Sequence, residues 1–61
     1  MSITFLIPVF NEAKTVKKAI EETINFNIPN KEIIIIDNGS TDGTSEIIKE
    51  YDDYENIKII F

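Results

Sequence analysis

The sequence predicts an α/β fold in which three parallel strands alternate with two helices. Three apolar runs rich in β-branched residues, at 3–7, 33–36 and 57–61, are typical of buried strands. The segments between these runs carry apolar residues at helical spacing. Strands that alternate with helices are joined by right-handed crossovers, so we expect parallel pairing throughout.

The N-terminal half contains the first strand and the first helix. Residues 3–7 form the strand, and we expect Pro8 to end its pairing because proline has no backbone N–H. A helix is predicted from Glu12 to about Asn25. Its apolar residues recur at the spacing of one helical face: Val16, Ala19, Ile20 and Ile24.

The C-terminal half contains the other three elements. Four consecutive isoleucines at 33–36 are typical of a strand that is buried on both faces. The turn-forming residues 37–43 are expected to lead into a second helix at 42–51, with Asp42 or a neighbour as its N-cap. After a polar turn at 52–56, residues 57–61 form the third strand.

These elements define a β-α-β-α-β fragment of a three-layer α/β arrangement. Two right-handed crossovers that step the same way give the strand order 3-2-1 and place both helices on one face of the sheet. The strands are apolar on both faces, so this chain leaves one face bare. We expect the rest of a longer chain, or a second copy, to cover it.

Composition restricts the function further. The 61 residues, expected to form one partial domain at 1–61, carry a net charge of −5 and show no basic face, which argues against nucleic-acid binding. No apolar run is long enough for a membrane segment, and no signal peptide is evident, so the predicted location is cytoplasmic. Cys and His are absent, so a bound metal would need oxygen ligands, as Mg or Mn do.

Two polar loops, at 8–12 and 37–43, leave the carboxyl ends of the first two strands. Ligands bind at this edge in open α/β sheets, so the loops form the predicted site. Phe10 offers a flat face to a base, while the carboxylates of Glu12 and Asp37 can accept hydrogen bonds from a base or a ribose. Gly39 permits a positive φ, and Ser40 offers a hydroxyl and an N–H group at a helix start.

Purely structural interpretations compete with each of these roles. Residues 37–43 can be read as a strand-to-helix turn, Glu12 as a first-turn acid favoured by the helix dipole, and Phe10 as a packing residue. Other nucleotide and metal motifs do not match. The second loop lacks G-x-G-x-x-G and G-K-[ST], and a calcium loop would require a glutamate where Lys49 stands.

Taken together, the two loops resemble the family 2 glycosyltransferases. The first motif is an apolar strand that runs into Pro-x-Phe-Asn-Glu, here Ile7-Pro8-Val9-Phe10-Asn11-Glu12. The second is Asp-Asp/Asn-Gly-Ser-x-Asp-Gly-Thr, here Asp37-Asn38-Gly39-Ser40-Thr41-Asp42-Gly43-Thr44. The resemblance extends over essentially the whole chain, and the pair of motifs is far more specific than either one alone.

The resemblance implies a GT-A fold, of which this chain would be the Rossmann-like N-terminal nucleotide-sugar-binding half. It implies inverting transfer of a sugar from a UDP- or GDP-linked donor to an acceptor. The implied nucleotide-binding residues are Pro8, Val9, Phe10, Glu12, Asp37, Asn38, Gly39 and Ser40. Many members have a second Asp where this chain has Asn38, which leaves the base preference open.

The resemblance also implies groups that this chain lacks. The family's Asp-x-Asp motif, which holds Mg or Mn on the diphosphate, and its catalytic base do not occur in these 61 residues. We therefore expect no catalytic residue or metal ligand here and no activity from this chain alone. The alternative function is a stand-alone nucleotide-binding or structural α/β module without catalysis.

Overall fold

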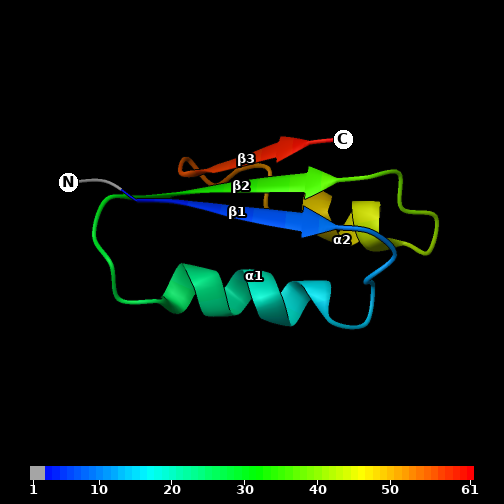
Figure 1. Ribbon diagram of the computed structural model, residues 1–61, viewed down its shortest axis with the longest axis horizontal. Coiled ribbons are helices and arrows are strands. Elements are labelled where there is room, and N and C mark those ends of the chain that lie inside the picture. Colours follow the sequence, from blue (N-terminus) through cyan, green and yellow to red (C-terminus); the bar gives the residue numbers. More distant parts are fainter. Residues whose placement is uncertain (1–2) are drawn as a thin grey trace.

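The computed structural model describes residues 3–61, which form a single three-stranded parallel sheet and two helices (Figure 1). In chain order, the elements are β1 (Ile3–Val9), α1 (Val16–Asn25), β2 (Lys31–Asp37), α2 (Thr44–Lys49) and β3 (Ile57–Ile60). β2 lies in the centre and pairs in parallel with both neighbours. The α/β fold class and the strand order with the second strand central are confirmed.

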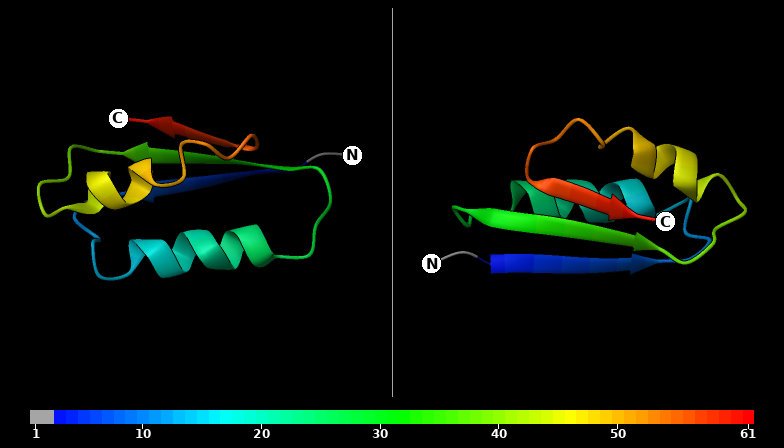
Figure 2. Two further views of the ribbon diagram at one scale, coloured as in Figure 1. Left: turned by 180° about the vertical axis from the view of Figure 1, so that it is seen from behind. Right: turned by 90° about the horizontal axis from the view of Figure 1, so that it is seen from above.

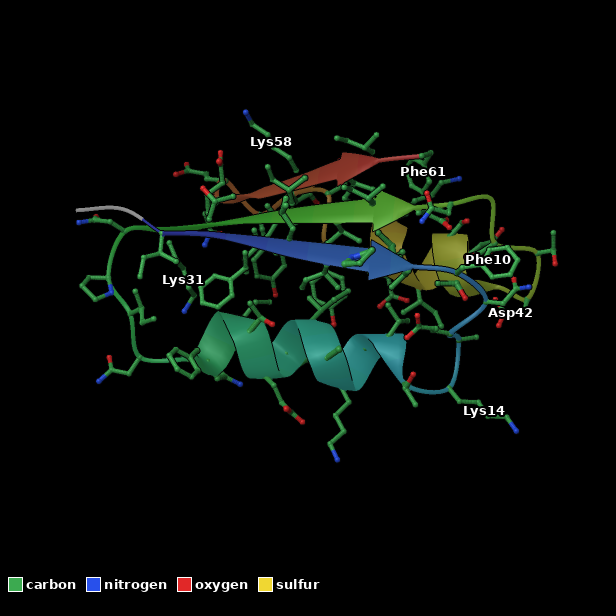
Figure 3. All side chains as sticks on the ribbon, in the orientation of Figure 1. Phe10, Lys14, Lys31, Asp42, Lys58 and Phe61 are labelled. Atoms are coloured by element: carbon green, nitrogen blue, oxygen red, sulfur yellow. The ribbon has the colours of Figure 1, made fainter. Side chains whose placement is uncertain are left out.

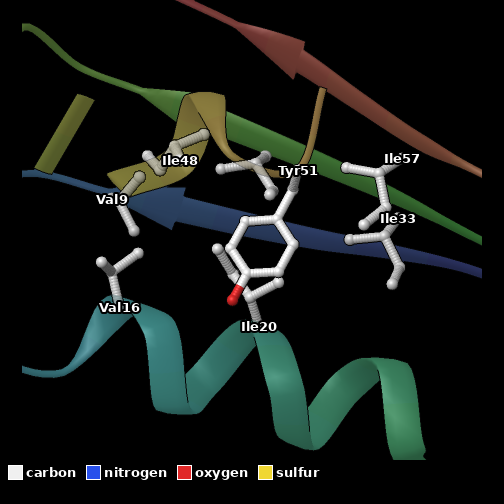
Figure 4. Close-up of a cluster of buried hydrophobic side chains, with 8 residues drawn as sticks. Val9, Val16, Ile20, Ile33, Ile48, Tyr51 and Ile57 are labelled. Carbon is white, nitrogen blue, oxygen red and sulfur yellow. The ribbon is translucent and has the colours of Figure 1, made fainter. Parts of the chain in front are cut away.

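Both helices pack against the same face of the sheet (Figures 1 and 2). The register places Ile7, Ile35 and Ile59 in one row across the three strands, on the face that the helices cover. Close by, Tyr51 extends from the end of α2 toward α1 among the buried aliphatic side chains (Figure 4). The Tyr51 hydroxyl donates a hydrogen bond of 2.7 Å to Glu21 Oε2 on α1, and burial raises the pKa of this hydroxyl.

The opposite face of the sheet has no helix over it in the described part of the chain. Leu6 is 63% exposed and Ile60 is 53% exposed, whereas Ile33 and Ile35 on the covered face are fully buried. The bare face predicted from the sequence is therefore present. The described residues supply two layers of the expected three, the sheet and its helices.

Strand boundaries differ from those predicted. β1 continues through Pro8, which pairs with Ile36, and ends at Val9. Proline is tolerated because β1 lies at the edge of the sheet, where a missing N–H removes no ladder hydrogen bond if it faces outward. β2 extends beyond the four isoleucines to Lys31 and Asp37, and β3 ends one residue before Phe61.

Both helices are shorter than predicted. α1 begins at Val16 instead of Glu12, since residues 13–15 form a turn in which the carbonyl oxygen of Glu12 accepts the N–H groups of Thr15 and Val16. Three of the four apolar residues of the predicted face are buried or half-buried, but Ala19 is exposed. α2 spans only Thr44–Lys49, and its N-cap is Gly43, the neighbour of Asp42, at a φ of 95°. A non-glycine residue would be strained at that φ.

Candidate functional site

Two loops leave the carboxyl ends of β1 and β2 and lie at the same end of the molecule (Figure 1). The first loop comprises residues 10–15 and the second loop residues 38–43. Phe10 of the first loop and Asp42 of the second loop both lie at this end, opposite Lys31 (Figure 3). The parallel pairing of β1 and β2 continues to Val9 and Asp37, so the two loops start side by side.

Backbone and side-chain hydrogen bonds join the two loops at their start. The N–H of Asn38 donates to the carbonyl oxygen of Val9 at 2.9 Å, which extends the strand pairing by one step. The N–H of Asn11 then donates to Ser40 Oγ at 2.9 Å. In return, the N–H of Thr41 donates to Asn11 Oδ1 at 2.7 Å. Asn11 has a φ of 49°, a left-handed conformation that Asn tolerates better than most residues.

A second set of bonds ties the first loop to the start of α2. The N–H of Glu12 donates to Thr44 Oγ1 at 2.9 Å, and the N–H of Ala13 donates to Asp42 Oδ2 at 3.2 Å. The N–H and the hydroxyl of Thr44 both donate to Asp42 Oδ1. The hydroxyl of Thr44 and the N–H groups of Ala13 and Thr44 hold the pKa of Asp42 below its ordinary value.

The hydroxyl of Thr41 also donates to Asn11 Oδ1, at 3.5 Å. We call the five residues whose side chains take part in these bonds the loop bridge: Asn11, Ser40, Thr41, Asp42 and Thr44. The bonds between the two segments join residues about thirty positions apart and fix one loop against the other. Four of them also satisfy a backbone N–H that strand or helix pairing leaves free. The loop bridge therefore gives this edge a defined shape without any ligand.

Asp37, at the end of β2, is engaged inside the protein. Its side chain is only 4% exposed. Oδ1 accepts the N–H of Ser40 at 3.0 Å, and Oδ2 accepts the hydroxyl of Ser45. The hydroxyl of Ser40, then that of Ser45, hold the pKa of the Asp37 carboxyl below its ordinary value against the effect of burial. Asp37 is thus an ionised group whose two oxygens already have partners.

Other predicted site residues face solvent. Phe10 is 56% exposed, and Glu12, Asn38 and Gly39 are exposed as well. Within residues 3–61, the side chains of Glu12 and Asn38 form no hydrogen bond. Gly39 has a φ of 83°, as its predicted role requires. These groups form an open surface, since residues 3–61 enclose no pocket.

The remaining predicted residues contribute differently. Pro8 is exposed at the end of β1, whereas the side chain of Val9 is buried in the core and only its carbonyl oxygen reaches the second loop. Ser40 belongs to the loop bridge and lies four residues before α2, not at the helix start. Val9 and Ser40 thus shape the edge without presenting a free side chain to solvent.

Sequence reasoning missed the structural importance of four residues. Asn11, Asp42 and Thr44 make bonds between the loops, and Ser45 fixes Asp37. All four are short polar residues next to turns, a class that bonds readily to nearby backbone. The sequence shows this tendency but does not show the partners, which lie about thirty residues away for Asn11, Asp42 and Thr44 and eight residues away for Ser45.

Neither a metal-binding cluster nor a membrane-spanning helix occurs among the described residues. Residues 3–61 contain no group of three or more carboxylates close enough together to hold a metal ion. Asp37 and Asp42 face partners in the protein, so the residues present do not fit a divalent cation site. No helix within residues 3–61 is long and apolar enough to cross a membrane.

Comparison with known proteins identifies the family. The model of the family described as "Glycosyl transferase family 2" matches residues 4–61. The chain belongs to this family. Its class is therefore that of the glycosyltransferases, as the two loop motifs indicate.

Curated relatives agree with this assignment. The chain is 40% identical over 58 residues to a poly-β-1,6-N-acetyl-D-glucosamine synthase of Staphylococcus epidermidis, with 95% of this chain and 14% of the relative aligned. It is 45% identical over 62 residues to a dolichyl N-acetyl-α-D-glucosaminyl phosphate 3-β-D-2,3-diacetamido-2,3-dideoxy-β-D-glucuronosyltransferase of Methanococcus voltae, covering 93% of this chain and 19% of the relative. It is 41% identical over 58 residues to a cholesterol galactosyltransferase of Borreliella burgdorferi, covering 93% and 16%.

The aligned part is a small share of each relative. The chain spans 14% to 20% of the length of the first relatives it matches. No solved structure gives a significant match to it.

Proposed function

We propose that this chain supplies the nucleotide-binding edge of a glycosyltransferase that transfers a sugar from a UDP- or GDP-linked donor to an acceptor with inversion. The observation that carries the proposal is the grouping of exposed Phe10, Glu12 and Asn38 at the carboxyl edge of the sheet. Open α/β sheets bind ligands at this edge. The family assignment supports the same kind of ligand.

Each exposed group suits one part of a nucleoside. The ring of Phe10 can stack on the base, a contact worth about 1 to 3 kcal/mol per base. The amide of Asn38 offers both a donor and an acceptor to the edge of that base. The carboxylate of Glu12 can accept hydrogen bonds from ribose hydroxyls. The loop bridge limits the conformational freedom lost on binding, which favours affinity.

Asp37 acts in this proposal as a positioning residue. Both of its oxygens have partners on the second loop and on α2, so its carboxylate holds the backbone from which Asn38 extends. Asp37 is only 4% exposed, so direct contact between its carboxylate and a base would require the surrounding loop to open.

The chain is proposed to act as the N-terminal segment of a larger GT-A domain. Further segments of that domain would cover the bare face of the sheet, where Leu6 and Ile60 are exposed. They would also supply the catalytic base and the metal ligands for Mg or Mn, since residues 3–61 hold no cluster that could bind a metal ion. The cytoplasmic location stays a prediction from sequence.

Nucleotide titration tests the binding site. UDP and GDP are added to the isotope-labelled chain, and amide chemical shifts are followed. The largest shifts are expected at Phe10, Glu12 and Asn38. Shifts centred on Asn30 or Asn56, at the opposite edge of the sheet, would show that the site is elsewhere. Inorganic pyrophosphate serves as the control that separates base recognition from simple anion binding.

An activity assay separates the proposal from its alternative. We expect this chain alone to transfer no sugar, because residues 3–61 hold no metal-binding cluster and the family resemblance places the catalytic base in a further segment. A longer chain that contains these residues should transfer sugar from a UDP- or GDP-linked donor. In the alternative, nucleotides bind to this chain while every longer chain that contains it fails to transfer sugar. That result would identify the chain as a stand-alone nucleotide-binding module.

A further inference from the structure

Asn38 and Gly39 stand apart from the hydrogen bonds that hold the rest of the second loop. Both residues are exposed, and the Asn38 amide has no partner within residues 3–61. The N–H of Gly39 also donates no hydrogen bond within this range. An unpaired side-chain amide is therefore adjacent in the chain to an unpaired backbone N–H.

We propose that Asn38 is a site of spontaneous deamidation. The backbone nitrogen of Gly39 loses its proton and attacks Cγ of Asn38. A bond forms between this nitrogen and Cγ, and the side-chain nitrogen leaves as ammonia with the proton. Water then opens the cyclic imide at one of its two carbonyl carbons. Opening at Cγ gives aspartate, and opening at the backbone carbonyl gives isoaspartate, so the net reaction exchanges ammonia for water without oxidation or reduction.

Local geometry favours the attack at this position. Gly39 has no side chain to obstruct the approach of its nitrogen to Cγ, and even a Cβ built at this residue meets nothing within 4 Å. The residue therefore has room to change its backbone angles as the ring closes. Its φ of 83° costs glycine little, so the backbone of the loop is not strained at this residue.

The other asparagines of the chain provide internal controls. Each is followed by a residue with a side chain: Asn11, Asn25, Asn27, Asn30 and Asn56. Two of these side chains are also engaged, since Asn11 accepts the N–H of Thr41 and Asn56 donates to the carbonyl of Lys31 at 3.4 Å. Asn27 is exposed like Asn38 but precedes Ile28, whose side chain obstructs the attack and whose N–H donates to the carbonyl oxygen of Phe26 at 2.8 Å, so it is the exposed comparison that lacks both favourable features.

The Asp42–Gly43 pair of the same loop is expected to resist ring closure. Gly43 also has a positive φ and open space around it. Asp42 differs from Asn38 in two ways: its ionised carboxylate resists nucleophilic attack more than an amide does, and its oxygens accept the N–H groups of Thr44 and Ala13. Closing a ring from Asp42 to the nitrogen of Gly43 would break these bonds. We therefore expect isoaspartate at position 38 and little at position 42.

The modification changes the chemistry of the exposed edge. The aspartate product carries a negative charge where the amide was neutral, and it loses the amide's hydrogen-bond donor. The isoaspartate product also lengthens the backbone beside the strand end. If the nucleotide binds as proposed, both products alter the group that faces the base, a consequence that rests on the proposed function.

The test is an incubation of the folded chain at neutral and at mildly alkaline pH, with peptide mapping by mass spectrometry and enzymatic detection of isoaspartate. Deamidation at Asn38 should be at least about tenfold faster than at Asn27, a barrier difference of about 1.4 kcal/mol. The rate should rise with pH, because the nitrogen of Gly39 must lose its proton. Comparable rates at the two residues would overturn the proposal.

A short peptide that spans residues 34–42 isolates the contribution of the fold. If the fold leaves Asn38 free to react, deamidation in the folded chain should be slower than in the peptide by a factor of less than about ten. A larger protection would mean that the loop holds Asn38 away from the nitrogen of Gly39 and would overturn the structural argument. The Asn38→Gln variant should lose the modification at this position, which verifies the assignment. Neither outcome depends on nucleotide binding.

Discussion

Two groups of polar residues share the carboxyl edge of the sheet but differ in how their side chains are used. In the loop bridge and at Asp37, side-chain oxygens bond to backbone N–H groups of the protein. At Glu12 and Asn38, the side chains extend into solvent without partners among residues 3–61. The ring of Phe10 is apolar but is also exposed, so we place it with the second group.

Because of this difference, we expect neighbouring residues of one motif to have separate roles, one in stability and the other in ligand binding. Asp37 and Asn38 are consecutive, yet Asp37 is 4% exposed and Asn38 is exposed. Substitutions in the bonded group should lower the free energy of unfolding. Substitutions in the exposed group should change ligand binding and leave stability almost unaltered.

The largest effect is expected from Asp37→Ala. Removing this carboxylate leaves the N–H of Ser40 and the hydroxyl of Ser45 without their acceptor. Leaving these two half-buried donors unpaired should lower the free energy of unfolding by about 2 to 4 kcal/mol. Urea unfolding followed by circular dichroism measures this loss.

Asp37→Asn is the matched control for this substitution. The amide keeps the shape and one acceptor oxygen, so its loss of stability should be clearly smaller than that of Asp37→Ala. If both variants unfold at the urea concentration of the parent chain, Asp37 does not hold the loop.

Phe10→Ala should show the opposite pattern. Loss of the ring should weaken UDP or GDP binding by about 1 to 3 kcal/mol, the scale of one base–aromatic stack. The free energy of unfolding should change by no more than about 0.5 kcal/mol, because the side chain is mostly exposed. Calorimetric titration and urea unfolding measure the two quantities.

Phe26 provides a control with the same exposure at the other end of the sheet. Both phenylalanines are 56% exposed, but Phe26 follows α1 and packs against Phe5. Phe26→Ala should leave nucleotide affinity unchanged. Equal loss of affinity in both variants would indicate an indirect effect on folding instead of a contact with the base.

Thr44→Val tests the loop bridge at its most buried member. Thr44 is fully buried, and its hydroxyl accepts the N–H of Glu12 and donates to Asp42. Valine keeps the branched shape and removes these bonds, which should cost about 1 to 2 kcal/mol of stability. The amide resonances of residues 11–13 should broaden or shift as the first loop loses its attachment. Unchanged resonances there would show that the remaining bonds suffice.

The fold followed from the sequence because its signals are local. Four consecutive isoleucines and the helical spacing around Ile20 predicted the strands and helices, and crossover handedness predicted their order. The boundaries of the elements were predicted less well. α1 begins at Val16 instead of Glu12, after loop residues whose N–H groups bond to Thr44 and Asp42, partners that no local pattern reveals.

For the candidate site, too, the local features were predicted from the sequence and the long-range contacts were not. The convergence of two loops at one edge followed from the parallel topology. The sequence could not tell which carboxylate stays free, since Glu12 and Asp37 look equivalent as acids beside a turn. Only the fold shows that Ser40 and Ser45 donate hydrogen bonds to Asp37. It also shows that the carboxylate of Glu12 has no partner within residues 3–61.

The smallest expected effect is a dependence of stability on acid pH that belongs to the bonded group alone. Hydrogen bonds hold the pKa values of Asp37 and Asp42 below their ordinary values. The folded state therefore binds protons less readily than the unfolded state. Stability from these groups is fully present above the unfolded pKa and is lost as pH falls through the folded pKa, so the loss should appear only below about pH 5.

Urea unfolding across a pH series measures this dependence. Asp37→Asn and Asp42→Asn should each flatten the fall in stability at acid pH, because the amide has no proton to gain. Asp53→Asn is the control, since Asp53 is exposed in the turn after α2 and away from both loops. If Asp53→Asn flattens the acid limb as much as Asp37→Asn does, the pH dependence reflects the overall negative charge of the chain and not the bonds that order this edge.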